Sequence, residues 1–193
     1  MKTRVINVDE YKAILTTIDT GFIYKVNGAD KKFRANHRVK LALMLEGNLG
    51  IRIGDIVNLT MKSFRSNGIN YTINITEQKT KKLREFTVPM EIYNVIKIYA
   101  LENGLYDTDK LFPLTERAVQ KQLKIVCSYL GLEDVSTHSF RKFYANQIFN
   151  NNEQNIELVR QLLQHSNIGI TQKYLGVSSN EVEKAINNHI YIV

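Results

Sequence analysis

The spacing of the apolar residues changes once along the chain from a helical period to the two-residue period of strands, and then returns to the helical period. This feature constrains the fold most. Residues 63–88 alternate apolar and polar side chains with the two-residue period of β-strands, most clearly in YTINIT. An Asn67-Gly68 pair marks a hairpin turn, and Pro89 ends the last run. We therefore predict a small three-stranded antiparallel sheet, with the lysine-rich segment EQKTKKL in its second hairpin.

On both sides of this region the apolar residues return at helical spacing. Before it we expect a helix that starts near a cap at Asp9, a buried helix over residues 36–47 and a short helix near Ile53. After it, four apolar stripes predict further helices: Ile92, Val95, Ile96 and Tyr99; Val119, Leu123, Val126 and Leu130, ended by Gly131; Phe140, Tyr144 and Ile148; Val159, Leu162 and Leu163. A possible capping box of Ser178 and Glu181 predicts a last helix over 179–190. The expected fold class is α+β, mainly α, with one small sheet.

A chain of 193 residues is long enough for one good hydrophobic core, and no repeat or linker divides it. We expect a single domain over residues 1–193. No apolar run approaches the roughly 18 residues that cross a bilayer, and the N-terminus lacks the apolar core of a signal peptide. The single cysteine, Cys127, excludes an internal disulfide and is interpreted as packing. These features predict a cytoplasmic protein.

The charge is uneven along the chain. There are 26 lysines and arginines against 19 acidic residues, and residues 1–100 carry 17 of the basic and 9 of the acidic side chains. Two basic clusters stand out: Lys31, Lys32, Arg34 and Arg38; Lys79, Lys81, Lys82 and Arg84. Such clusters suit a polyanion such as DNA or RNA, because each neutralised phosphate releases condensed counterions. Charge alone leaves a solvated basic surface as the alternative.

Three segments carry residues suited to chemistry on a phosphate. His138 and Arg141 share one face of a predicted helix near its start, where the backbone N–H groups also favour an anion. Arg52 lies among apolar residues and needs a partner if it is buried, either Asp55 or a bound phosphate. His165 precedes Tyr174 by nine residues across a polar break. Each segment alone has a structural explanation: a capped helix with a surface arginine, an Arg52–Asp55 pair, and a buried tyrosine near a capping histidine.

Together, these segments resemble the tyrosine recombinases, the phage integrase family. GIRIGDIVNL resembles the first arginine box of the family, and EQKT resembles its lysine turn. THSFR resembles the H-x-x-R box, and LLQHSNIGITQKYL the terminal segment from histidine to tyrosine. The four motifs occur in the family's order and cover the chain from about Val8 onward, as the family's catalytic domain. Two features depart from the family pattern: Gln164 stands where many members have glycine, and the separate N-terminal core-binding domain of most members is not present, as in a fragment or a short member.

The resemblance implies a site-specific recombinase or integrase that cleaves and rejoins DNA through a 3′-phosphotyrosyl intermediate. Tyr174 would be the nucleophile, and Arg52 and Arg141 would hold the non-bridging oxygens. Lys79 would protonate the departing 5′-oxygen, although the hairpin register also leaves Lys81, Lys82 or Arg84 open for this role. His138 would assist proton transfer at the tyrosine, and His165 would donate a hydrogen bond to the phosphate. His37 and His189 match no motif and are interpreted as structural or surface residues.

The expected partners are double-stranded DNA and further copies of the chain, four protomers acting at two DNA sites, with no metal and no cofactor. The exposed basic set expected to contact DNA is Lys31, Lys32, Arg34, Arg38, Lys81, Lys82 and Arg84. The last helix could dock on a neighbouring protomer or pack on its own domain. Two other functions remain open from the sequence, a type IB topoisomerase and a DNA-binding regulatory factor that does not cut. The amino-acid sequence indicates neither the target DNA sequence nor which of integration, excision, inversion and resolution the protein performs.

Overall fold

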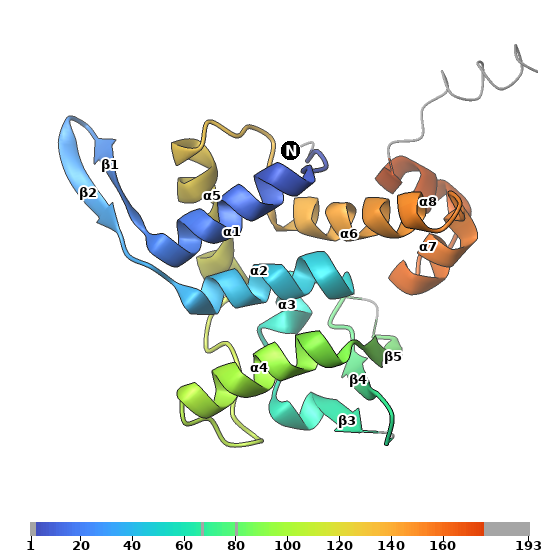
Figure 1. The fold of residues 1–193 in the computed structure, drawn as a ribbon. Helices are drawn as coiled ribbons and strands as arrows, with labels where there is room; N and C mark the ends of the chain where they lie inside the picture. The colour runs from blue at the N-terminus through green and yellow to red at the C-terminus, as the bar shows by residue number, and fades with distance from the viewer. Residues whose placement is uncertain (1–2, 67, 80, 176–193) are drawn as a thin grey trace, which may run out of the picture.

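The computed structural model describes residues 3–66, 68–79 and 81–175, and it is mainly helical with two small sheets (Figure 1). The helices are α1 Val8–Thr20, α2 His37–Leu49, α3 Ile53–Ile56, α4 Met90–Glu102, α5 Glu116–Tyr129, α6 Thr137–Asn151, α7 Ile156–Leu163 and α8 Ile168–Leu175, with a 3-10 turn at Met61–Ser63. The strands are β1 Phe22–Val26, β2 Ala29–Phe33, β3 Phe64–Ser66, β4 Tyr71–Thr76 and β5 Leu83–Val88. The predicted α+β, mainly α fold is confirmed. The predicted helix over 179–190 and His189 lie outside the described residues.

The three-stranded sheet is antiparallel in the order β3-β4-β5, as the alternating pattern predicts. Ile73 in the central strand is buried and lies opposite Phe64 on one side and Phe86 on the other. Helix α4 packs on this sheet through Tyr93, whose ring stacks on that of Tyr71. The lysine-rich segment joins β4 to β5, as predicted. Asn67, in the other predicted turn, lies outside the described residues.

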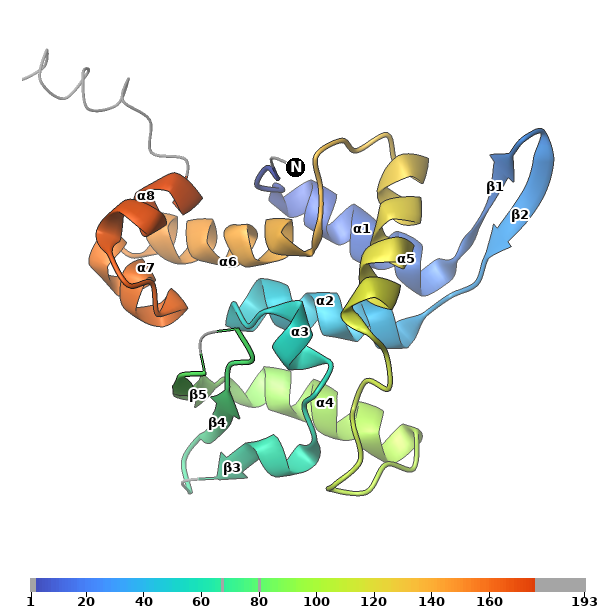
Figure 2. The same ribbon diagram turned by 180° about the vertical axis from the view of Figure 1, so that it is seen from behind.

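The β1–β2 hairpin was missed in the sequence analysis. Its five-residue strands pair in register around Asn27 and Gly28, both of which have positive φ angles of 52° and 81°. Asn-Gly is the preferred pair for a two-residue turn of this kind, so the signal was present in the sequence. Figures 1 and 2 show the hairpin projecting from the end of the molecule opposite to α7 and α8.

Helix α2 is the centre of the main core, because it packs against α1, α3 and α6. Its N-cap is Asn36, whose side chain accepts a hydrogen bond from the Val39 N–H. In α1 the cap is Asn7, which forms a capping box with Glu10, so the predicted Asp9 cap is wrong by two residues.

The predicted stripe of α4 is also only partly buried. Ile96 and Tyr99 face the core, but Val95 is 44% exposed.

No helix among the described residues is long and apolar enough to cross a membrane.

Helices α7 and α8 form a small second core with the C-terminal half of α6 (Figure 2). Four buried side chains make it: Ala145, Val159, Leu163 and Leu175. The chain reverses direction at Gln164, which has a φ of +53°, the left-handed conformation that glycine adopts most easily. This reversal brings the residues after α7 back toward α6.

Candidate active site

One cavity of about 360 Å³ brings together all six residues predicted to be catalytic. They come from five parts of the chain: Arg52 caps the start of α3, Lys79 lies between β4 and β5, His138 and Arg141 lie on α6, His165 follows α7, and Tyr174 lies on α8. Lys82, Lys142 and Gln164 also line the cavity. The groups converge although 122 residues separate the first from the last in the sequence (174 − 52).

Arg141 is fixed from within the fold. Its residue is only 2% exposed, Nη1 donates to the carbonyl of Gly50, and Nη2 donates to the carbonyl of Leu163 at 3.0 Å. These bonds tie α6 to the ends of α2 and α7. Burial lowers the pKa of Arg141 from its ordinary value, but a guanidinium remains charged at neutral pH. The structural alternative of an ordinary surface arginine is therefore wrong.

Arg52 has a different partner from the predicted one. Its Nη1 lies 2.5 Å from Oε2 of Glu77, whose side chain is 1% exposed. Asp55 instead accepts a hydrogen bond from the backbone N–H of Gln78 at 2.9 Å. The predicted Arg52–Asp55 pair is thus wrong, and both acids hold the β4–β5 connection against α3.

Arg84 does not belong to the basic surface on which the sequence analysis placed it. Its side chain is 3% exposed, with Nη1 donating to Gly50 at 3.1 Å and Nη2 to Leu162 at 2.7 Å. Burial lowers its pKa to about 10. Arg84 is also absent from the lining of the cavity, whereas Lys79 and Lys82 both line it.

His165 and Tyr174 face each other across the turn between α7 and α8. Their rings meet edge to face, with centroids 5.3 Å apart, and Nδ1 of His165 shares a 3.0 Å hydrogen bond with the Thr171 hydroxyl. Burial lowers the pKa of His165 to about 4, and the nearby Arg141 adds to this effect. Burial raises the pKa of the Tyr174 phenol to about 12, against the opposing effect of Arg141. At neutral pH the imidazole and the phenol are therefore both uncharged.

His138 lines the same cavity. Partial burial lowers its pKa, and the positive charge of Arg141 acts in the same direction. Neither histidine therefore adds a positive charge to the cavity at neutral pH. The positive potential comes from the arginines and lysines.

Glu46 also lies in this region and was not among the residues predicted from the sequence. It is fully buried in the last turn of α2, and its Oε1 accepts a hydrogen bond from the Ile53 N–H at 3.2 Å, next to Arg52. Its Oε2 has no hydrogen-bond partner among the described residues. Burial raises the pKa of Glu46 well above its ordinary value, although Arg141 opposes this shift. A single acid inside the apolar run LALMLEGNL was the available signal.

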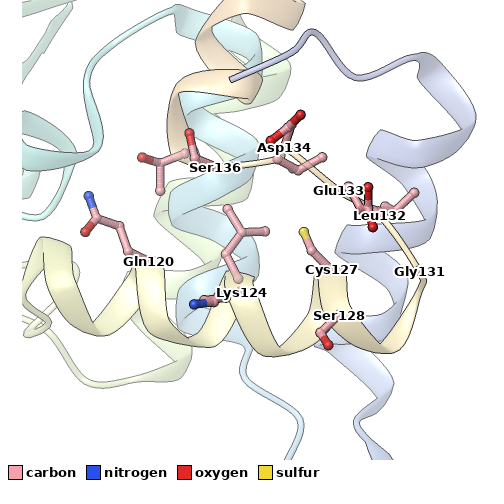
Figure 3. A pocket seen from close by; sticks show the side chains of 12 residues that line it. Gln120, Lys124, Cys127, Ser128, Gly131, Leu132, Glu133, Asp134 and Ser136 are labelled. Atoms are coloured by element: carbon pink, nitrogen blue, oxygen red, sulfur yellow. The ribbon is translucent and has the colours of Figure 1, made fainter. Parts of the chain in front are cut away.

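A larger cavity of about 610 Å³ lies between α5 and the connection to α6, and none of the six predicted residues lines it (Figure 3). Cys127 points into it from α5, and burial raises the pKa of this thiol to about 11. A thiol that is protonated at neutral pH is a poor nucleophile, in agreement with the interpretation of Cys127 as packing.

The other predicted basic residues are exposed. Lys31 and Lys32 lie on β2, Arg34 follows it, Arg38 is in the first turn of α2, and Lys81 lies in the β4–β5 connection. His37 is also exposed and lies 2.5 Å from Asp19, so its interpretation as a surface residue is confirmed.

The chain is similar to known proteins of one family. A family model described as "Phage integrase family" matches residues 4–181. "Probable integrase/recombinase YoeC" of Bacillus subtilis (strain 168) is 26% identical over 145 residues, which are 72% of this chain and 77% of that protein.

Two solved structures have the same fold. The XerH site-specific recombinase bound to difH substrate aligns with a TM-score of 0.68 at 23% identity, over 96% of this chain and 55% of that one. The catalytic domain of bacteriophage HP1 integrase aligns with a TM-score of 0.66 at 18% identity, over 97% of this chain and 96% of that one. The chain thus spans about half the length of the XerH chain.

Proposed function

This chain belongs to the phage integrase family, and from that premise we propose that it is a site-specific recombinase that cleaves and rejoins DNA strands through Tyr174. The observation that carries the proposal is the single cavity shared by Arg52, Lys79, His138, Arg141, His165 and Tyr174. A cavity lined by two anchored guanidiniums, lysines and a phenol suits attack on a phosphodiester. The described residues would be the catalytic domain.

The two guanidiniums would hold the scissile phosphate. Arg141 is anchored by backbone carbonyls and Arg52 by Glu77, so both are placed before DNA arrives. Groups that are fixed in advance stabilise the charge of a pentacoordinate transition state without reorganising at the moment of reaction. Planar guanidiniums are also suited to binding two phosphate oxygens at once.

The phenol must lose its proton when its oxygen attacks phosphorus. With a pKa of about 12, Tyr174 is protonated before the reaction and needs a base. His138, neutral at pH 7, would accept this proton. The Tyr174 oxygen forms a bond to phosphorus, and the bond from phosphorus to the 5′-oxygen breaks. Rejoining is the reverse: a 5′-hydroxyl attacks the phosphotyrosine and Tyr174 recovers its proton.

The departing 5′-oxygen would take a proton from a lysine of the β4–β5 connection. Lys79 is our assignment from the family resemblance, and Lys82 is its alternative, because both line the cavity. Arg84 is buried in contact with carbonyls, so it is not in a position to donate.

His165 would donate a hydrogen bond from Nε2 to a phosphate oxygen. This arrangement requires the Thr171 hydroxyl to donate to Nδ1, because a neutral ring that accepts at Nδ1 carries its proton on Nε2.

The substrate would be double-stranded DNA, and the similar XerH site-specific recombinase bound to its difH substrate supports a DNA site as the target. The exposed Lys31, Lys32, Arg34, Arg38, Lys81 and Lys82 would contribute to binding it. Four protomers would act on two DNA sites, with exchange of strands between them. Integration, excision or resolution of a mobile element are the expected outcomes of such exchange.

A nicked duplex library of random sequence tests the proposal without a known target. A nick next to the cleavage point lets the short 5′-hydroxyl strand diffuse away, so the covalent complex accumulates and survives a denaturing wash. We expect captured DNA with the wild-type protein and none with Tyr174→Phe. Tyr106→Phe, at an exposed tyrosine, is the matched control and should behave like the wild type. Duplex binding without any captured DNA would favour a regulatory factor that does not cut, and relaxation of a plasmid by monomers would favour a topoisomerase.

A further inference from the structure

The β1–β2 hairpin is held against α5 by aromatic rings. The ring of Phe22 stacks on that of Tyr129 with centroids 4.0 Å apart, and on that of Phe33 at 4.9 Å. This stack fixes the base of the hairpin, whereas the tip is open, with no atom within 4 Å of a Cβ built on Gly28. The hairpin is therefore a braced arm that projects beyond the helices (Figures 1 and 2).

A cleft of about 380 Å³ lies between this arm and α5. One wall is Tyr24, Lys25 and Val26 of β1, and the other is Lys121, Lys124, Ile125, Ser128 and Tyr129 of α5. Lys31 lies directly opposite Tyr24 in the strand register, although it does not itself line the cleft. This cleft shares no lining residue with the cavity of Tyr174.

The charged side chains that line the cleft are all positive. Lys25, Lys121 and Lys124 line it, and no acidic residue does, within the part of the chain that the structure describes. Asp30, the one acid on the two strands, lies directly opposite Lys25 and so shares its face, although it does not line the cleft. Several ammonium groups that face a common space repel one another, and an anion with regularly spaced charges relieves this repulsion.

We propose that this cleft is a second DNA-binding site, which holds the phosphate backbone of the duplex at a distance from the cleaved phosphate. The inference rests on the proposed function, because it takes duplex DNA as the polyanion. The walls suit this occupant: the lysines match phosphates, while Tyr24 and Ile125 offer apolar surface to the sugars between them. The exposed Lys32 on β2 and Arg34 just after it add further positive charge to the arm.

The test compares two triple variants with equal loss of charge. The cleft variant is Lys25→Gln, Lys121→Gln and Lys124→Gln. The control variant is Lys12→Gln, Lys62→Gln and Lys97→Gln, three exposed lysines of α1, the 3-10 turn and α4. Fluorescence anisotropy with a long duplex of arbitrary sequence gives the affinity at several salt concentrations, and thermal unfolding checks that all three proteins fold.

We expect the cleft variant to lose about 0.9 in the slope of log affinity against log salt for each phosphate contact removed, so about 2 to 3 in all. The control variant should keep most of the wild-type slope. With a duplex too short to reach the arm, the difference between the cleft variant and the wild type should vanish. Equal losses in both variants would mean a net-charge effect and overturn the proposal. An unchanged slope in the cleft variant would also overturn it, and would leave an acidic protein surface as the partner.

The proposed function can fail separately from this inference. At saturating DNA the cleft variant should form the covalent complex at the wild-type rate, because its changes are outside the cavity of Tyr174. If the wild-type protein forms no covalent complex, but the cleft variant shows a weaker salt dependence of DNA binding, the proposed cleavage chemistry is refuted and the proposed DNA-binding cleft is supported. A wild-type protein that cuts DNA, with a cleft variant that binds as well as it does, would refute the cleft alone.

Discussion

Glu77 lies between two arginines, with Oε2 2.5 Å from Nη1 of Arg52 and Oε1 3.7 Å from Nη1 of Arg84. One of these guanidiniums reaches the cavity and the other binds backbone carbonyls inside the fold. A single buried carboxylate thus couples the geometry of the candidate site to the packing of the β4–β5 hairpin. Its negative charge offsets the positive charge of both guanidiniums.

Glu77→Gln should destabilise the protein strongly. The substitution keeps the shape but leaves buried arginine charge uncompensated, and breaking a buried pair in this way costs about 3–5 kcal/mol. The free energy of unfolding in urea measures the effect. Glu85→Gln, at an exposed position on β5, should change stability by less than about 0.5 kcal/mol. Similar values for the two variants would contradict the role assigned to Glu77.

Arg84→Lys distinguishes the structural role of Arg84 from the DNA-binding role proposed for the exposed lysines beside it. A lysine cannot reach the carbonyls of Gly50 and Leu162 together, so we expect a loss of about 1–3 kcal/mol in stability. The salt dependence of DNA binding should stay at the wild-type value. Lys82→Gln should do the opposite, with normal stability and a weaker salt dependence. If Arg84→Lys weakened DNA binding without loss of stability, the buried role would be wrong.

Glu46 should make the protein less stable as the pH rises. Its folded pKa is raised, so above the unfolded value near 4.5 the unfolded chain releases a proton that the folded chain keeps. Stability from this group is present below that value and is lost as the pH rises toward the folded pKa. Glu46→Gln keeps the acceptor for the Ile53 N–H and removes the titration. The free energy of unfolding of the variant minus that of the wild type should therefore be more positive at pH 8 than at pH 5, and an equal difference at the two pH values would contradict the prediction.

His165 should titrate far below an ordinary histidine. Its pKa is lowered to about 4, so between about pH 4 and the unfolded value of 6.5 the unfolded chain binds a proton that the folded chain does not. Stability from this group is complete above pH 6.5 and falls as the pH decreases toward 4. The imidazole resonance of His165, assigned with His165→Asn, reports the pKa by NMR. A midpoint near 6.5 would show that the ring is not buried beside Arg141.

The sequence predicted the local structure better than the long-range partners. The sheet and most helices were accessible because periodicity is a local property, and the set of six residues came from the resemblance of four motifs to a known family. The β1–β2 hairpin carried the same Asn-Gly signal as the predicted one, and it was missed because its strands are short and mostly exposed.

The ion pairs were not accessible in this way. Arg52 has an acid three residues away, yet its partner is 25 residues away (77 − 52). Arg84 has two lysines close by in the sequence, but only the folded chain brings the carbonyls of Gly50 and Leu162 to it. Spacing along the chain gives no information on such contacts, because they depend on how α2, α7 and β5 pack together.

Mass spectrometry of the covalent complex tests the central claim most directly. After reaction with nicked duplex DNA, nuclease digestion and trypsin, the peptide YLGVSSNEVEK, which begins at Tyr174, should carry a nucleotide joined through its 3′-phosphate to the phenol. The account predicts this modification on Tyr174 and on no other residue. A nucleotide found on another side chain, or unmodified Tyr174 in protein that has released a 5′-hydroxyl strand, would contradict it.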